Sequence, residues 1–330
     1  MQLPPRLGCC MLWAAVVGNI VSIANVVTHC ADNLELFHDA ADRRHEIREF
    51  KRTYSSSSDH AALHKIQNEF ESVRDKMGKI YSQQWCERRH LRWDRLDYVR
   101  KVSNLHLENI LKSGFLEQNP DPSELTRFSD VDQLTAAILL AGSNSLLTTK
   151  RHIKTKGKLA TVVEVYTTKG DRAHIGNESV NHSISKRTSK TQLLTYYGGQ
   201  HSNERRALVV YKTSVVPPHT ALLFCKGEIR TEEANTDECN MTNFLLPNHK
   251  LQVLVPSSQA STFLKAREML WNTFQYYIER DLKSIPYDDH VTISRFTARL
   301  IKSVTKILSE AHREYAVRER SLFSDEDDEI

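Results

Sequence analysis

The 330-residue sequence lacks the short motifs on which common enzyme classes depend. It contains no G-x-x-x-x-G-K-[ST] loop, which would surround the phosphates of a nucleoside triphosphate with backbone amides and a lysine. It also contains no G-x-S-x-G turn for a nucleophilic serine and no H-E-x-x-H pair for zinc. We therefore predict no catalytic residues, no cofactor and no enzyme activity for this chain alone.

Cysteine is scarce and widely spaced, with six residues in the whole chain: Cys9, Cys10, Cys30, Cys86, Cys225 and Cys239. This is not the dense pattern of a small disulfide-stabilised domain. The spacing of Cys225, Cys239 and His219 also differs from the paired C-x-x-C arrangement of zinc sites, so we predict no metal. Asp288, Asp289 and His290 include an acid and a base, but they fall in a predicted turn, where acidic residues are common.

The longest apolar stretch, Pro4 to Val27, contains one charged residue, Arg6. A basic residue, an apolar run and small residues at Ser22–Ala24 are typical of a secretory signal peptide. The segment from Cys9 to Val27 also reaches the lower length limit of a membrane span, and it is equally compatible with two buried helices. Sequons for N-glycosylation favour secretion, and they begin at Asn177, Asn181 and Asn240.

Positive charge is concentrated in one part of the chain. Residues Lys150 to Lys212 contain 13 lysines and arginines against four acidic residues, so the remainder of the chain is net acidic although the total is +4. A basic block of this kind suggests an anionic partner, whereas a solvated basic surface is the plainer alternative.

The first half of the sequence is predicted to be helical. Ser58 or Asp59 suits the cap of a helix whose apolar residues recur at spacings of three and four: Leu63, Ile66, Phe70, Val73, Met77 and Ile80. A second helix is predicted from Trp85 to Leu111, ending at Gly114, and a third from Val131 to Ala141. Prolines between residues 118 and 123 indicate a linker.

The period of the apolar residues then becomes that of strands. Four short segments are rich in β-branched or aromatic residues and are separated by glycines: Leu159–Tyr166, Ala207–Tyr211, Ala221–Cys225 and Leu251–Val255. They predict a small β-barrel or sandwich of strands, preceded by a basic loop from Lys150 to Lys158. Within this loop Lys154, Lys156 and Lys158 alternate, which in an extended segment puts all three on one face.

Helical periodicity returns from Ser261 and continues, after a turn at Pro286–Asp289, from Ile293 to Ala311, which predicts a helical hairpin. Residues 324–329 are strongly acidic and are expected to form a tail. The predicted fold is α+β and multidomain. It comprises a helical bundle over residues 1–125, an OB-fold-like domain over 126–260, a helical extension over 261–315 and an acidic tail over 316–330.

Several of these segments, taken in order, resemble the region that follows the motor domains of DExH-box (DEAH/RHA-type) RNA helicases. In the helical ratchet of that family the similar segments are Pro5–Gly8 with Met11–Leu12, Ser58–His60 with Leu63, and Gln84–Cys86. In its C-terminal OB-fold they are Val165–Thr167, Ser179–Asn181, Val210–Tyr211, Thr213, Val215, Pro217, Leu222–Phe224 and Gly227. The similarity covers roughly residues 4 to 255.

The resemblance implies that the opening stretch forms buried helices, that the strands form a small OB-like β-barrel, that the cysteines are reduced, and that the protein is cytoplasmic or nuclear. It implies an RNA-binding accessory region without the RecA-like motor domains, whose phosphate loop, DExH box and arginine finger the sequence lacks. The sequence also departs from the family at Gly176-Asn177, where His-Pro is usual, which puts that local RNA contact in doubt.

We expect single-stranded RNA to bind the basic residues of the β region, with cations on phosphates and a ring such as Tyr166 or Tyr211 stacking on bases. The expected phosphate contacts are Lys154, Lys156, Lys158, Lys169, Arg172 and Lys212. Helicase motor domains or activator proteins are further expected partners, and a membrane is not. The alternatives are a protein-docking module built on the OB-fold, with no direct RNA role and a merely solvated basic block, and a secreted glycoprotein.

Overall fold

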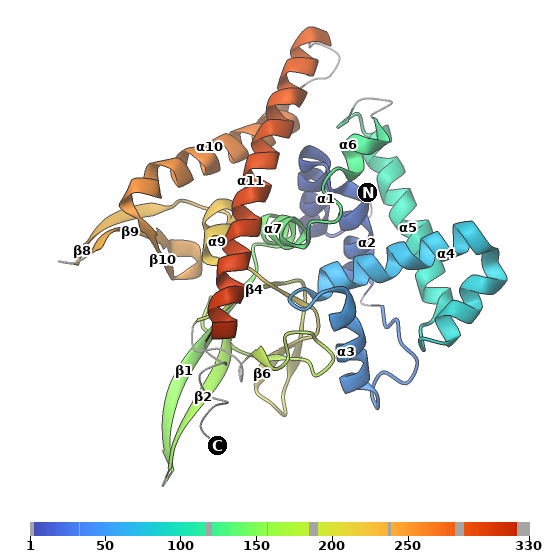
Figure 1. Cartoon of the computed structure of the whole chain (residues 1–330), viewed down its shortest axis with the longest axis horizontal. Helices are drawn as coiled ribbons and strands as arrows, with labels where there is room; N and C mark the ends of the chain where they lie inside the picture. The colour runs from blue at the N-terminus through green and yellow to red at the C-terminus, as the bar shows by residue number, and fades with distance from the viewer. Residues whose placement is uncertain are drawn as a thin grey trace.

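The computed structural model describes residues 3–32, 34–116, 121–156, 158–184, 191–236, 239–280 and 287–321. Helices occupy both ends of the chain and two β-sheets lie between them in sequence, which confirms the α+β class (Figure 1). The predicted domain boundaries at residues 125, 260 and 315 stay predictions.

Seven helices form the first part of the chain: α1 (Pro5–Val17), α2 (Ile20–Ala31), α3 (Arg44–Tyr54), α4 (Asp59–Glu87), α5 (Trp93–Lys112), α6 (Pro122–Thr126) and α7 (Asp132–Ser143). The predicted cap of α4 is Ser58, whose hydroxyl accepts a hydrogen bond from the Ala61 N–H at 3.0 Å. Gly18 joins α1 to α2 at a φ of 75°, and a Cβ there would lie 2.6 Å from the Glu124 carbonyl oxygen. A glycine is therefore required at this turn.

The larger sheet contains seven strands: β1 (Leu146–Lys156), β2 (Lys158–Thr167), β3 (Arg172–Ile175), β4 (Leu193–Tyr196), β5 (Gln200–Ser202), β6 (Ala207–Val210) and β7 (Thr213–Val215). Their order is β5-β6-β3-β2-β1-β4-β7, and all pairs are antiparallel except β3 with β6. The predicted closed barrel is not what forms in the described residues, where β5 and β7 are opposite edges of an open sheet.

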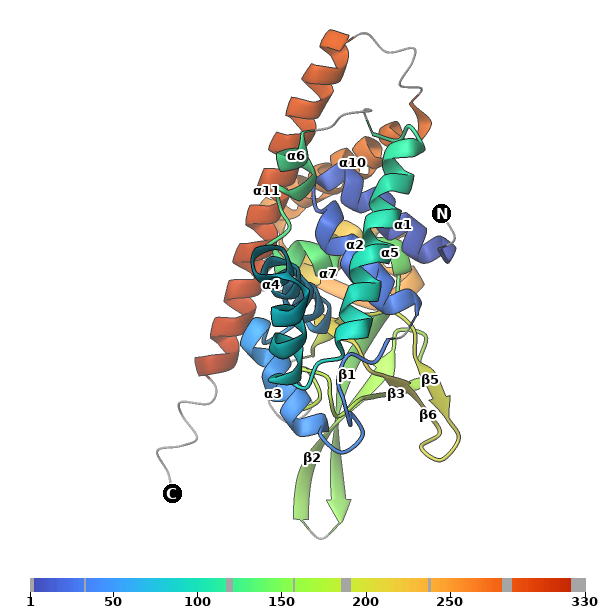
Figure 2. The same cartoon turned by 90° about the vertical axis from the view of Figure 1, so that its right-hand side faces the viewer.

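The remaining elements are helix α9 (Pro218–Phe224), the small sheet of β8 (Arg230–Thr236), β9 (Cys239–Leu246) and β10 (Leu251–Pro256), and helices α10 (Ser257–Glu279) and α11 (Tyr287–Ser321). The prediction of a strand over Ala221–Cys225 is wrong, because Pro217 and Pro218 start a helix there and its apolar residues are buried all round. Helix α11 contacts α1, α7 and α9 as well as α10, so it packs across the molecule rather than on its predicted partner alone (Figure 2).

The prediction of a loop over Lys150–Lys158 is also wrong. These residues belong to β1 and the start of β2, which pair over ten positions as one long antiparallel hairpin. Both views show this hairpin pointing away from the helices (Figures 1 and 2). The basic segment was not recognised as a strand because it offers almost no apolar alternation, which is the main strand signal in a sequence.

The largest core joins both helical ends of the chain to the small sheet, and α1 and α2 contribute more than a dozen of its residues. This agrees with the buried-helix interpretation of the opening stretch. No helix in the described residues is long and apolar enough to cross a membrane. Trp13 lies at the centre of this core, stacked on Phe274 at 3.9 Å between ring centroids and edge-on to Trp271 at 5.1 Å.

Replacing Trp13 by alanine should lower the free energy of unfolding by roughly 3–5 kcal/mol, because the cavity left between α1, α9 and α10 cannot collapse. Urea denaturation of the full chain measures this. Met77→Ala is the control, since that side chain is 62% exposed and its loss should change stability by no more than about 0.5 kcal/mol. Equal effects of the two substitutions would contradict the central position of Trp13.

Candidate nucleic-acid interface

Three of the six predicted RNA contacts lie together at the tip of the β1–β2 hairpin. Lys156 pairs with Lys158 across the two strands, and Lys154 pairs with Ala160 two positions further from the tip. Because paired residues and alternate residues of a strand share a face, the three lysine positions fall on one face of the hairpin. Their side chains lie outside the described part of the structure.

Nearer the base of the hairpin, two of the predicted groups have partners within the protein. The Arg172 guanidinium forms an ion pair with Glu164 at 3.2 Å, with 57% of the arginine side chain exposed. The Lys150 ammonium lies 5.3 Å from the centroid of the Tyr166 ring, and the Tyr166 hydroxyl donates to Glu164 at 2.6 Å. Arg172 is therefore partly neutralised, and the ring proposed for base stacking already has a cation near it.

Lys212 lies apart from the hairpin. Its ammonium group donates to the His29 carbonyl oxygen at the end of α2, at 2.9 Å, and burial lowers its pKa. Lys169, in contrast, is exposed in the turn between β2 and β3 and lines a cavity described below. The structure thus distributes the six residues over the hairpin tip, the β2–β3 region and the interior next to α2. Tyr211, the other candidate ring, is only half-buried and borders a different cavity beside Lys212.

The segments Ser58–His60, Ser179–Asn181 and Thr213–Val215 meet at a buried carboxylate. Asp59 is fully buried at the start of α4 and forms an ion pair at 2.7 Å with Lys51 of α3. It also accepts hydrogen bonds from the backbone N–H of Val180 at 3.1 Å and of Thr213 at 3.0 Å, and from the Ser179 hydroxyl. We call these five residues the Asp59 junction, because they join the helices to the large sheet.

Residues next to the junction strengthen the same contact. The Val215 N–H donates to the Ser57 carbonyl oxygen at 2.9 Å, and the Asn181 side chain donates to that oxygen at 3.1 Å. The Asn181 side chain is therefore buried in the fold and inaccessible as a glycosylation acceptor. The sequence comparison with the helicase region identified each of these segments separately. It did not identify Asp59 as the charged group that holds them together.

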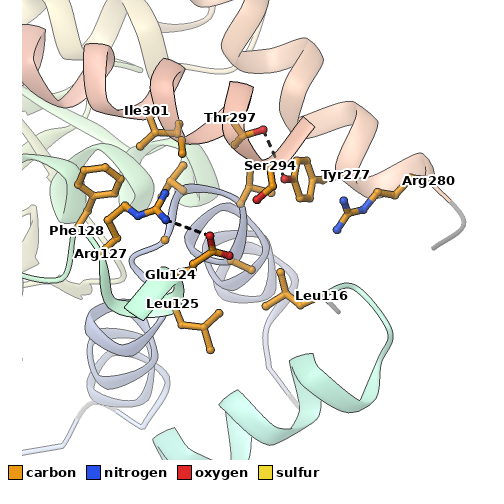
Figure 3. Close-up of a pocket in the computed structure, with 15 residues that line it drawn as sticks. Leu116, Glu124, Leu125, Arg127, Phe128, Tyr277, Arg280, Ser294, Thr297 and Ile301 are labelled. Carbon is orange, nitrogen blue, oxygen red and sulfur yellow. Dashed lines mark hydrogen bonds and ion pairs between the residues drawn. The ribbon is translucent and has the colours of Figure 1, made fainter. Parts of the chain in front are cut away.

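The cavities of the described structure differ in size and lining. One of about 340 Å³ lies between α3 and the Tyr211–Lys212 segment, and one of about 460 Å³ lies at the base of the β1–β2 hairpin. A third, of about 80 Å³, lies between α1, α6, α10 and α11 (Figure 3). There Arg127 pairs with Glu124 at 3.2 Å, and the Tyr277 hydroxyl contacts Thr297, so this small gap is closed by packed side chains.

Within the described ranges, no group of three or more histidine, cysteine, aspartate or glutamate side chains is placed to hold a metal ion. Burial raises the pKa of the Cys30 thiol to about 11 and that of Cys225 to about 12, so both stay protonated near neutral pH. No protein-family model matches this chain, and no curated protein matches it.

Replacing Asp59 by asparagine should lower the free energy of unfolding by about 3–5 kcal/mol, because Lys51 would remain buried without its carboxylate. Chemical denaturation monitored by circular dichroism measures the change. Glu108→Gln breaks the exposed pair with Lys112 and should cost no more than about 1 kcal/mol. A cost for Asp59→Asn as small as that of the control would show that the junction does not stabilise the fold.

Three buried histidines near the junction predict a loss of stability in mild acid. Burial lowers the pKa of His29 to about 3 and those of His60 and His64 to about 4, below the value of about 6.5 in an unfolded chain. Below pH 6.5 the unfolded state therefore binds protons that the folded state does not, and the free energy of unfolding falls as the pH decreases toward 4. The limiting slope for three protons is about 4 kcal/mol per pH unit.

Urea denaturation at several pH values between 7.5 and about 5 measures this slope, above the range in which carboxylates titrate. His64→Gln should reduce the slope by up to about 1.4 kcal/mol per pH unit if the variant folds, because one such proton is lost. A free energy of unfolding that is constant over this range would contradict the assignment of neutral, buried imidazoles.

Proposed function

We propose that this chain is a binding module for single-stranded RNA, of the kind found as the accessory C-terminal region of DExH-box RNA helicases, without a motor of its own. The observation that supports the proposal most directly is the β1–β2 hairpin. It extends away from the body of the protein, and residues 150–158 on it include five lysines and arginines and no acidic residue.

Such a hairpin suits a polyanion for electrostatic reasons. Residues 151–163 of the hairpin contain no acidic residue, so their cations are neutralised most effectively by an external anion. The position of the three lysines on one face matches the repeated phosphates of a nucleic-acid strand better than it matches a single anion. Binding of this kind depends on charge and not on base sequence.

The Asp59 junction supports the family part of the proposal. Three of the segments that resemble the helicase region, which together span more than 150 residues of sequence, contact one another around one carboxylate. Similarity that arose by chance would not be expected to converge on a single buried network. The helicase motor domains and activator proteins remain proposed partners, and a cytoplasmic or nuclear location remains a prediction.

A second candidate function is protein docking, and the outer part of α4 favours it. Gly78 interrupts the helix with a φ of 84°, and around it Met77, Ile80 and Tyr81 are 62%, 69% and 60% exposed. Exposed apolar side chains gathered at one position are typical of interaction surfaces. This surface is separate from the hairpin, so the two functions can be tested independently.

Replacing Lys154, Lys156 and Lys158 together by glutamine should weaken the binding of a fluorescent oligouridylate and flatten the salt dependence. For single strands each phosphate contact contributes a slope of about −0.7 in log affinity against log salt, so the loss of three should reduce the slope by about two. Fluorescence anisotropy over a range of salt concentrations measures both quantities.

The matched control removes the same charge from exposed positions outside the basic block, with glutamine at Lys265, Arg299 and Lys302. The control should retain the original slope and unfold at the temperature of the original protein, because its substitutions are external. If the hairpin variant folds and its slope equals that of the control, the basic hairpin is only a solvated surface and the docking function becomes the better proposal.

A further inference from the structure

The cavity of about 460 Å³ at the base of the hairpin is lined by residues from distant parts of the sequence. We call it the hairpin-base cavity and define it by Arg6, Asn144, Lys169, Tyr196, Lys226 and His249. Among the described residues that line it, three have cationic side chains and Asp171 alone has a carboxylate. The lining is therefore net positive, although only Lys169 belongs to the basic block recognised in the sequence.

Two of these cations have no ion-pair partner within the described residues. Arg6 and Lys169 are exposed at the edge of the cavity, and no carboxylate of the described chain lies within 4 Å of either charged group. The Lys226 ammonium is half-buried and contacts the Cys9 sulfur at 3.6 Å, which is a weak acceptor. All three groups can accordingly bind an external anion without first giving up an internal salt bridge.

The wall between these cations is fixed by a polar network around His249, which is buried. His249 Nε2 donates to the Asn144 side-chain oxygen at 2.9 Å, and the Thr168 hydroxyl donates to His249 Nδ1 at 3.0 Å. The same Asn144 side-chain oxygen also accepts a hydrogen bond from the backbone N–H of Lys226 at 2.9 Å. Burial lowers the pKa of His249, so the imidazole is neutral, and the network holds the backbone of Lys226 next to the turn that carries Lys169.

The first turn of α1 adds to the positive field on the opposite side. Its N-cap, Pro4, offers no side-chain acceptor to the free backbone amides, and Arg6 belongs to this turn. The turn is held against α7 by a close approach at Gly142, where a Cβ would lie 2.2 Å from the Cys10 sulfur and 2.9 Å from the Arg6 carbonyl oxygen. The carboxyl end of α7 is capped by Asn144, whose backbone N–H donates to the Leu140 carbonyl oxygen at 2.8 Å.

An aromatic side chain completes the lining. Tyr196, at the end of β4, is half-buried. Burial raises the pKa of its hydroxyl group. The positive charge of Arg6 lowers this pKa, and the negative charge of Asp171 raises it further. These two charges therefore lie within electrostatic range of the phenol. A ring next to three cations can contact a base or sugar while the cations bind a phosphate.

We propose that the hairpin-base cavity binds one phosphate-bearing nucleotide, with the phosphate on Arg6, Lys169 and Lys226 and the nucleoside against Tyr196. The site is separate from the hairpin tip and from the Asp59 junction. The nucleotide is either free or a unit of an RNA strand. The inference rests on the proposed function only if the nucleotide belongs to an RNA strand.

The test uses the full chain, with adenosine 5′-monophosphate as the probe and adenosine as the phosphate-free comparison, in isothermal titration calorimetry at low salt. The nucleotide should bind more tightly than the nucleoside. Glutamine at Arg6, Lys169 and Lys226 should weaken nucleotide binding at least roughly tenfold, because charge-assisted hydrogen bonds are lost. The control with glutamine at Lys265, Arg299 and Lys302 should bind as the original protein does.

A fluorescent oligouridylate distinguishes the two sources. If the free nucleotide does not bind but the cavity variant weakens oligonucleotide binding more than the control does, the occupant is a unit of the RNA strand. If the hairpin variant leaves oligonucleotide binding unchanged while the nucleotide still binds the cavity, the proposed function fails and this inference stands. Measurable binding that is equal for nucleotide and nucleoside, or no effect of the cavity variant on either the nucleotide or the oligonucleotide, overturns it.

Should the triple variant fail to fold, Lys169→Gln alone decides the question, because this side chain is exposed in a turn. It should weaken nucleotide binding several-fold without changing the melting temperature. An unchanged affinity in this folded variant overturns the proposed phosphate contact.

Discussion

The buried carboxylate of Asp59 is the constraint on which the relation between the helices and the large sheet depends. An ionised group that is fully removed from water is unstable unless its lone pairs are satisfied, and here both oxygens accept hydrogen bonds from an ammonium, a hydroxyl and two backbone amides. Two of these donors belong to the backbone of segments 121 and 154 residues away in sequence. Because backbone donors cannot rotate away, they fix the position of the sheet on α4. The β1–β2 hairpin is part of that same sheet, so its direction relative to the helices is fixed as well.

Local signals in the sequence predicted the start of α4 and the existence of α7, because a serine cap and a periodic apolar face need no distant partner. The boundary between α4 and α5 was not predictable in this way. The break at residues 88–92 contains neither glycine nor proline; His90 adopts a φ of 55°, and Leu91 forms a bridge with Phe37, which precedes it by more than fifty residues. Helix α4 therefore ends where Leu91 can form its bridge with Phe37. This tertiary contact overrides the helical pattern of the sequence, which continues past Trp85.

The candidate site shows the same division between local and distant information. The number of lysines and arginines in the sequence identified the basic block, but such a count assumes that every basic side chain is exposed and unpaired. Lys212 instead inserts its ammonium group beside α2, and Arg172 has Glu164 as a partner. The cations that gather at the hairpin-base cavity come from α1, from the β2–β3 turn and from the segment after α9, which only the folded chain brings together. No spacing rule applies to residues that are 57 to 220 positions apart.

The positive charge that remains available for phosphates is therefore smaller than the sequence count, and the two groups of cations proposed to bind phosphates lie at the two ends of one strand. Leu146, the first residue of β1, lines the hairpin-base cavity, whereas Lys156, its last residue, lies at the tip. Eleven residues of strand span about 33 Å between these ends. Under the proposed function, one RNA strand that follows β1 would contact a shaped pocket at the base and unshaped charge at the tip. The pocket would then determine where a nucleotide is held, and the hairpin would contribute salt-dependent affinity that does not depend on the base sequence.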